Sequence, residues 1–239
     1  MVPYDRFTVV LDACTLFPML ARDVLLTLAA HEFFSPKWSA RIRDEWTRNL
    51  LAQMQERSTD GDAQKRVDRI VAAMTAAFPD ADVDVELVEL PALEPVDAKD
   101  RHVVATAVAA HADAIVTFNV KDFAADHLKE RLQIEVIHPD DFIMDLIDLN
   151  EKRAVAAFRE LRARKKNPPW AVDEIVKRLQ TSGLVQTSLW LNTKDVAALM
   201  RATHSTLIRC SAEKAAVFRE YRSQVRQSES RRSHRQIEV

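Results

Sequence analysis

The chain has 239 residues with a net charge of −2, and 47% of them are apolar and 29% charged, so most of it is expected to fold around a core. It holds only two glycines, Gly61 and Gly183, and two cysteines, Cys14 and Cys210. These counts exclude a glycine-rich phosphate loop, a dinucleotide-binding fingerprint, a disulfide framework and a cysteine-rich zinc site.

The N-terminal part alternates between short apolar runs and amphipathic stretches. Phe7–Leu11 predicts a buried strand, and an amphipathic helix is expected to follow Pro18. Phe33–Pro36 indicates a short strand or turn. Two further helices are predicted, one capped by Ser39 and one that ends before Pro79.

The alternation continues in the middle of the chain. Val83–Val88 has the period of a strand, and Asp97–Ala112 predicts an alanine-rich helix. Ala114–Phe118 and Ile134–Ile137 are expected to be buried strands. Strands and helices in this order favour an α/β fold with a mostly parallel central sheet.

After about residue 140 the strand pattern stops, and helices are predicted over Asp141–Leu149, Glu151–Arg164 and Ala171–Gln180. Lys194–Tyr221 is compatible with helix, and the polar end of the chain is expected to be disordered. We therefore divide the chain into an α/β domain (1–145), a helical C-terminal extension (146–190) and a basic helical tail (191–239).

Acidic residues follow or flank the predicted strands. Asp12 comes directly after the first strand, and Asp122 follows the strand that ends at Phe118. Ligands bind beyond the carboxyl ends of parallel strands, so these acids can converge with Glu45 and Asp100. Carboxylates packed together repel one another, and Mg²⁺ or Mn²⁺ relieves that repulsion and supports phosphodiester hydrolysis.

Each acid also has a structural alternative. Asp100 and Asp122 could cap helices, and Glu45 could pair with Arg41 or Arg48 on its own helix. Asp12 is the hardest to explain in this way, because a carboxylate after a wholly apolar strand is costly without a partner.

Five segments in order resemble the PIN domain, the fold of the VapC-type toxin ribonucleases. They are Val9–Cys14, Ile42–Trp46, Asp97–Ala107, Ile115–Phe123 and His138–Phe142. The most specific is Ile115–Phe123, which is similar to the family's Thr-x-Asn-x-x-Asp-Phe stretch. The resemblance covers residues 6 to about 145.

The resemblance implies an α/β/α sandwich and RNA cleavage that depends on Mg²⁺ or Mn²⁺. It places Asp12, Glu45, Asp100 and Asp122 at the catalytic and metal-binding positions. The auxiliary residues would be Asp97, Thr117 and Asn119. It further implies a homodimer and a cognate antitoxin protein that blocks the site.

The first hypothesis is therefore an endoribonuclease toxin, in which water attacks the RNA phosphate in line and the 3′ oxygen leaves. The alternative is a PIN-like module that has lost catalysis and binds RNA or a protein. A phosphatase of the haloacid dehalogenase type ranks last, because Cys14 stands where that family has a second aspartate.

The charge is distributed unevenly: residues 1–150 carry a net −12 and residues 151–239 a net +10. The densest basic cluster is a candidate RNA-binding patch, although a solvated helix end has the same composition. Its members are Arg162, Arg164, Lys165 and Lys166. The basic part is equally suited to an acidic partner.

Two residues beside the acids are expected to be structural. His102 is assigned to a helix face rather than to phosphate contact, and Cys14 is expected only to pack. Charged residues interrupt the first thirty positions, and no apolar run approaches the ~20 residues of a membrane span. We expect a cytoplasmic protein outside the membrane.

Overall fold

A computed structural model of the chain describes residues 7–57, 62–85, 93, 95–166, 169–193, 196, 197 and 200. Residues 1–197 form one compact unit and residues 198–239 a second, and only the first is described below. The predicted helix over Lys194–Tyr221 and the predicted disordered end lie almost wholly outside the described residues.

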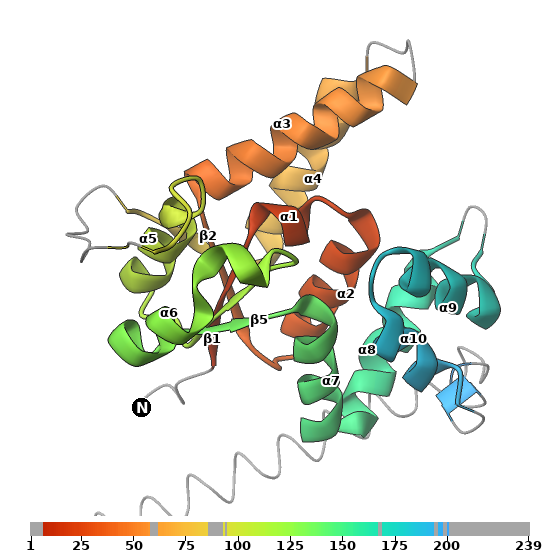
Figure 1. Cartoon of the computed structure of the whole chain (residues 1–239). Coiled ribbons are helices and arrows are strands. Elements are labelled where there is room, and N and C mark those ends of the chain that lie inside the picture. The colour runs from red at the N-terminus through yellow and green to blue at the C-terminus, as the bar shows by residue number, and fades with distance from the viewer. Residues whose placement is uncertain are drawn as a thin grey trace, which may run out of the picture. The chain divides into compact units, whose positions relative to one another are not determined.

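The centre of the first unit is a parallel sheet (Figure 1). In the described residues it has five strands in the order β3-β2-β1-β4-β5. All four strand pairings are parallel, which confirms the predicted α/β class. The strands are β1 (Thr8–Leu11), β2 (Ser35–Ser39), β3 (Asp82–Val83), β4 (Ala114–Val116) and β5 (Glu135–Ile137).

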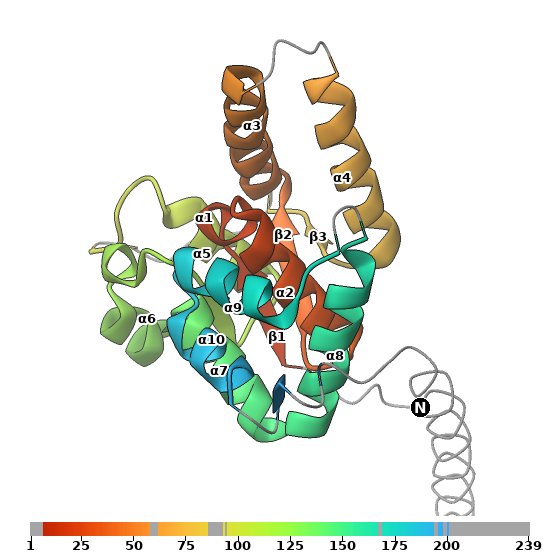
Figure 2. The same cartoon turned by 90° about the vertical axis from the view of Figure 1, so that its right-hand side faces the viewer.

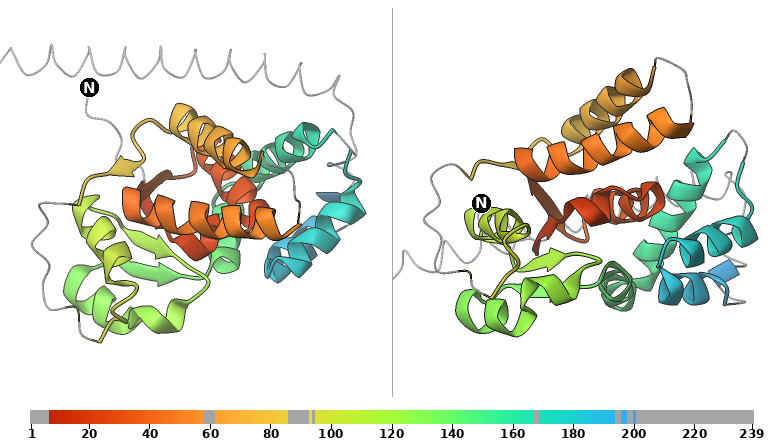
Figure 3. Two further views of the ribbon diagram at one scale, coloured as in Figure 1. Left: turned by 90° about the horizontal axis from the view of Figure 1, so that it is seen from above. Right: turned by 45° about the horizontal axis from the view of Figure 1, so that its top comes forward.

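Helices cover both faces of this sheet. After β1 come α1 (Ala13–Leu16) and α2 (Met19–Ala30), and after β2 come α3 (Ala40–Arg57) and α4 (Ala63–Ala77). The helices after β3 and β4 are α5 (Arg101–Ala109), the 3-10 turn η1 (Val120–Phe123) and α6 (Ala125–Leu132). Because parallel crossovers are right-handed, the reversal of strand order beside β1 puts α5 and α6 on the face opposite α1–α4. Figure 1 shows α5 and α6 on one side of the strands and α2 on the other, and Figure 3 shows α4 beside α3.

The remaining described helices follow β5. They are α7 (Pro139–Leu149), α8 (Glu151–Arg164), α9 (Val172–Thr181) and α10 (Val185–Leu191). α8 packs against α2, and α10 packs against α7 and α9 (Figure 2). The predicted helical extension is therefore present, but α10 is a helix that the residue pattern did not predict.

The core lies where the strand pattern was most apolar. Val9, Val10, Leu11, Ile115 and Val116 have no exposed surface. Runs this apolar suit strands that are covered on both faces, which is the position of β1 and β4. None of the described helices is long and apolar enough to cross a membrane.

Several element boundaries differ from the predictions: β2 is Ser35–Ser39 rather than Phe33–Pro36, and β4 ends at Val116 rather than at Phe118. Strand β3 ends at Val83, and residues 86–88 of the predicted strand lie outside the described residues. The helix predicted from Asp97 begins only at Arg101, because residues 97–100 form a turn in which the Asp100 amide donates to the Asp97 carbonyl at 2.9 Å. This turn carries the carboxylates of Asp97 and Asp100.

Candidate active site

Asp12 lies directly after β1, at the point where the strand order reverses. The Asp12 amide donates to the carbonyl of Val116, the last residue of β4, at 3.1 Å. Such a switch point is where open parallel sheets bind ligands. The Asp12 side chain is 4% exposed, and it does not cap α1. A buried carboxylate in this place needs donors, and two side chains supply them.

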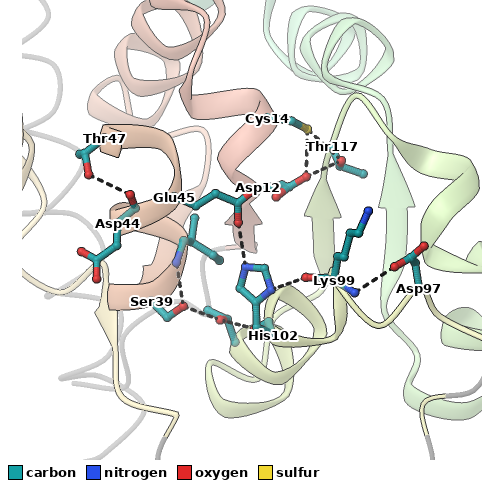
Figure 4. A network of polar contacts seen from close by, with 12 residues as sticks. Asp12, Cys14, Ser39, Asp44, Glu45, Thr47, Asp97, Lys99, His102 and Thr117 are labelled. Atoms are coloured by element: carbon teal, nitrogen blue, oxygen red, sulfur yellow. Dashed lines mark hydrogen bonds and ion pairs between the residues drawn. The ribbon is translucent and has the colours of Figure 1, made fainter. Parts of the chain in front are cut away.

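Thr117 and Cys14 both hydrogen-bond the same oxygen of Asp12 (Figure 4). The Thr117 hydroxyl donates to Oδ2 at 2.7 Å, and the Cys14 thiol donates to it at 2.9 Å. Thr117 directly follows β4, so two neighbouring strand ends meet at this carboxylate. The second oxygen, Oδ1, accepts no hydrogen bond from the residues that the structure describes.

The thiol of Cys14 has a structural role that the sequence pattern did not reveal. Its Sγ lies 3.2 Å from the Thr117 hydroxyl and accepts the Phe118 amide at 3.3 Å. Burial, and after it the charge of Asp12, raises the pKa of Cys14 to about 12. The thiol therefore stays protonated and donates to Asp12, which excludes the thiolate that nucleophilic catalysis requires. The expectation that Cys14 only packs was incomplete.

Glu45 reaches the site from α3 and pairs with His102 of α5. The His102 Nε2 lies 3.4 Å from Glu45 Oε2, and the His102 Nδ1 donates to the Lys99 carbonyl at 2.7 Å (Figure 4). The His102 side chain is 8% exposed, so it is buried beside the acid rather than lying on a free helix face. Among the described residues, the basic side chain that Glu45 contacts is His102 and not Arg41 or Arg48.

Asp97 and Asp100 lie in the turn before α5. The Asp97 carboxylate accepts the Lys99 amide at 2.9 Å, which fixes the turn. Asp100 occupies the N-cap position of α5, but its side chain makes no capping hydrogen bond. Capping therefore does not account for the carboxylate of Asp100.

Asp122 and Asn119 lie in the segment after β4. Asp122 is inside η1, and the N-cap of α6 is Ala124, so Asp122 does not cap that helix. The Asp122 carbonyl accepts the Asp97 amide at 3.1 Å, which joins this segment to the turn before α5. Asn119 contributes its amide to the Thr117 hydroxyl at 3.0 Å. Asn119 thus supports Thr117 through its backbone.

Besides burial, neighbouring acids contribute to a raised pKa of Asp100. Burial raises it, and so do the charges of Asp12, Asp97, Asp122 and Glu45, in that order, from 3.8 to about 6. Only acids that lie near one another in space repel in this way. The structure therefore brings together the acids that the strand ends predict, from β1, α3, the turn before α5, and η1.

Replacing Asp100 by asparagine is expected to stabilise the metal-free protein at neutral pH. The folded state holds the Asp100 proton up to about pH 6, whereas the unfolded state loses it near 3.8. The free energy of unfolding therefore falls as the pH rises from 3.8 to about 6, and the full destabilisation by Asp100 is present above pH 6. Solvent screens this partly exposed group, so the gain at pH 7.5 should be about 1 kcal/mol.

Urea unfolding of the two proteins in EDTA, at pH 7.5 and at pH 4.5, measures this effect. The gain should shrink at pH 4.5, where both states hold more of the proton. An equal change at the two pH values, or a loss of stability at pH 7.5, would show that the acids do not repel Asp100.

The donor set fits an oxygen-preferring dication in charge and in ligand type. The mutual repulsion at Asp100 and the lack of a described donor to Oδ1 of Asp12 are the two observations that support this fit. Within the described ranges, no three His, Cys, Asp or Glu side chains are close enough to hold one ion as they stand. The fit of the site to a dication therefore rests on the negative charge of neighbouring acids rather than on a preformed set of metal ligands.

The four residues of the predicted RNA-binding patch are used in part for packing. Lys165 forms a 2.5 Å ion pair with Asp23 and lies over the ring of Trp170, and Arg164 hydrogen-bonds Thr27. These contacts tie the end of α8 to α2. Arg162 donates to the Trp170 carbonyl at 3.0 Å, and Lys166 is exposed. Their contact with RNA stays a prediction.

Two families match the chain, one over each part of the first unit. Residues 8–121 match the PIN domain, and residues 139–192 match the VapC50 C-terminal domain. The first range contains every predicted catalytic acid except Asp122, which follows it directly. The second range begins with α7 and ends just after α10.

A curated protein of Mycobacterium tuberculosis (strain ATCC 25618 / H37Rv), named "Putative ribonuclease VapC50", is 41% identical over 81 residues. The aligned stretch covers 34% of this chain and 47% of the relative, so the chain spans about half the length of that protein. No solved structure matches the chain significantly. The parallel sheet, the acids at its carboxyl edge and both family matches agree: residues 8–121 form a PIN domain, and a C-terminal domain of the VapC50 kind follows at residues 139–192.

Proposed function

We propose that this protein is a metal-dependent endoribonuclease and the toxin of a toxin–antitoxin pair. The observation that carries the proposal is the gathering of five carboxylates around the end of β1. The turn of Asp97 and Asp100 is joined to the segment of Asp122 by the Asp97 amide, and Glu45 approaches through His102. The PIN domain match and the ribonuclease name of the relative support RNA as the substrate.

The acids have distinct roles in this proposal. Asp12 and Asp100 hold the cation, with Glu45 and Asp122 beside them, and Asp97 shapes the turn that carries Asp100. Thr117 and Cys14 fix Oδ2 of Asp12, which directs Oδ1 toward the ligand. A bound Mg²⁺ or Mn²⁺ supplies charge that polarises a phosphate oxygen and lowers the pKa of the attacking water.

The chain's own residues also determine how RNA approaches. The acidic surroundings of Asp12 repel a polyanion, so binding needs a basic surface elsewhere on the protein. Arg164 and Lys166 are exposed at the end of α8 and are the candidates within the described residues. Salt should therefore weaken RNA binding more than it weakens metal binding.

The proposal extends to partners and location. We infer a cognate antitoxin protein that blocks the acidic site, a homodimer and a place in the cytoplasm. The resemblance to VapC-type toxins supports these three points, and the VapC50 C-terminal domain match adds to that support.

Cleavage of total cellular RNA by the purified protein tests the activity. Discrete cuts are expected with Mn²⁺ or Mg²⁺, and none with EDTA. The positions of the cuts identify the target RNA. Folded protein that is free of antitoxin and makes no cuts under any of these conditions would instead favour a PIN-like module that binds RNA or protein.

A further inference from the structure

The turn between α9 and α10 reaches the loop that follows β4. Gly183 lies in this turn with a φ of +81°, a conformation that L side chains rarely adopt. A Cβ added at Gly183 would lie 3.3 Å from Cε1 of Phe118. The backbone of the VapC50 C-terminal domain therefore lies directly against the ring of Phe118.

The N-cap residue of α7 also contacts the ring of Phe118. His138, the N-cap of α7, packs edge-on against Phe118, with ring centroids 5.1 Å apart and an interplanar angle of 82°. The His138 Nδ1 accepts the Asp140 amide at 3.2 Å. The carboxylate of Asp140 in turn accepts the Gln186 and Thr187 amides of α10, at 2.7 and 3.0 Å. Both partners of Phe118 are thus fixed to the same helical domain.

The backbone of Phe118 belongs to the network around Asp12. Its amide donates to Cys14 Sγ at 3.3 Å, and Cys14 donates to Asp12 Oδ2. The preceding residue, Thr117, donates to the same Oδ2. A displaced Phe118 ring would move its own backbone and that of Thr117, and with them the donors that orient the carboxylate.

We propose that the VapC50 C-terminal domain positions Asp12 through Phe118, which the Gly183 turn and His138 hold from two sides. Phe118 and Gly183 are then positioning residues for the reaction, and α7–α10 are a working part of the nuclease rather than an appended module. The effect of this positioning on RNA cleavage rests on the proposed function. Its effect on the cover of the Cys14 thiol does not depend on activity.

Cys14 provides a readout that does not need activity. Its alkylation by iodoacetamide reports whether the Thr117–Phe118 loop still covers the thiol, once Cys210 is replaced by serine. The variants are Phe118→Leu and Gly183→Ala, each in the Cys210→Ser background. The matched control is Phe78→Leu, because Phe78 is also half-buried and packs edge-on against one aromatic ring, that of Trp38, at 6.4 Å.

In folded protein we expect Phe118→Leu and Gly183→Ala each to speed Cys14 alkylation about tenfold, since the loop opens more often. We expect kcat for RNA cleavage to fall about tenfold at a nearly unchanged KM, because the reacting groups are misplaced rather than the RNA lost. Phe78→Leu should change neither value. In the double variant the smaller leucine side chain leaves room for the methyl group of the alanine, so the combined effect should be less than the product of the two single effects.

The outcomes separate the positioning role of Phe118 and Gly183 from the proposed nuclease function. The positioning role would be overturned if Phe118→Leu and Gly183→Ala had the same alkylation rate and kcat as the Phe78→Leu control. Faster alkylation in both, in a protein that cleaves no RNA under any condition, would uphold the coupling and reject the proposed function instead. If Gly183→Ala fails to fold, Phe118→Leu, which adds no atoms, decides alone.

Discussion

Replacing Asp12 by asparagine should lower RNA cleavage by roughly a thousandfold or more and leave the fold intact, because it removes charge from the centre of the site. The amide keeps the size of the carboxylate and an oxygen that accepts from Thr117 and Cys14. It also removes one of the charges that raise the pKa of Asp100, so that pKa should fall toward 3.8. Single-turnover cleavage with Mn²⁺ measures the first effect, and NMR titration of Asp100 measures the second.

The matched control is Asp148→Asn, which makes the same chemical change at an exposed position of α7. It should cleave RNA at the rate of the unaltered protein. Folded Asp12→Asn protein with full activity would contradict the proposed site. An unaltered pKa of Asp100 in that variant would contradict the convergence of the two carboxylates.

The largest expected loss of stability comes from Asp140→Ala. Asp140 is 3% exposed and accepts three hydrogen bonds from the start of α10, two from the Gln186 and Thr187 amides and one from the Thr187 hydroxyl at 2.7 Å. Its removal leaves the buried amide and hydroxyl of Thr187, and the part-buried amide of Gln186, without an acceptor. We expect a loss of about 3 kcal/mol, and a Tm lower by about 6–12 °C for a unit of this size.

Asp141→Ala is the control for this prediction. Asp141 is the next residue along α7, and it is exposed and hydrogen-bonded to the side chain of the same Gln186. Its loss should cost no more than about 0.5 kcal/mol. Thermal unfolding of both variants in EDTA gives the comparison. Equal Tm changes in the two would show that Asp140 does not hold α10 in place.

The position of the site could be predicted because strand ends are local features. Leu11 and Phe118 end apolar runs, and a parallel sheet brings the residues after them to one edge. That rule predicted Asp12 near Asn119 and Asp122, whereas Thr117 was assigned to the strand itself. Because β4 ends two residues earlier than predicted, at Val116, Thr117 is the residue that donates to Asp12, at 2.7 Å. The order of the motifs, rather than any one of them, then indicated the family.

The features that the sequence did not predict depend on distant partners. The pattern of Val185–Leu191 is weakly helical by itself, and the capping group of this helix comes from Asp140, 46 residues earlier. The local partners Arg41 and Arg48 were reasonable for Glu45, yet the fold brings it His102 from another helix. Cys14 resembles an apolar residue in sequence, and only the three-dimensional contacts show its thiol as a donor.

The central strand is also the first one to be made, and this has a consequence for synthesis on the ribosome. β1 pairs with β4, and the Thr117–Asp12 hydrogen bond joins residues 105 positions apart. A nascent chain therefore carries Asp12 long before it carries the groups that orient it. The Gly183 turn emerges later still. A growing chain therefore cannot complete the surroundings of Asp12 until nearly the whole first unit has left the exit tunnel.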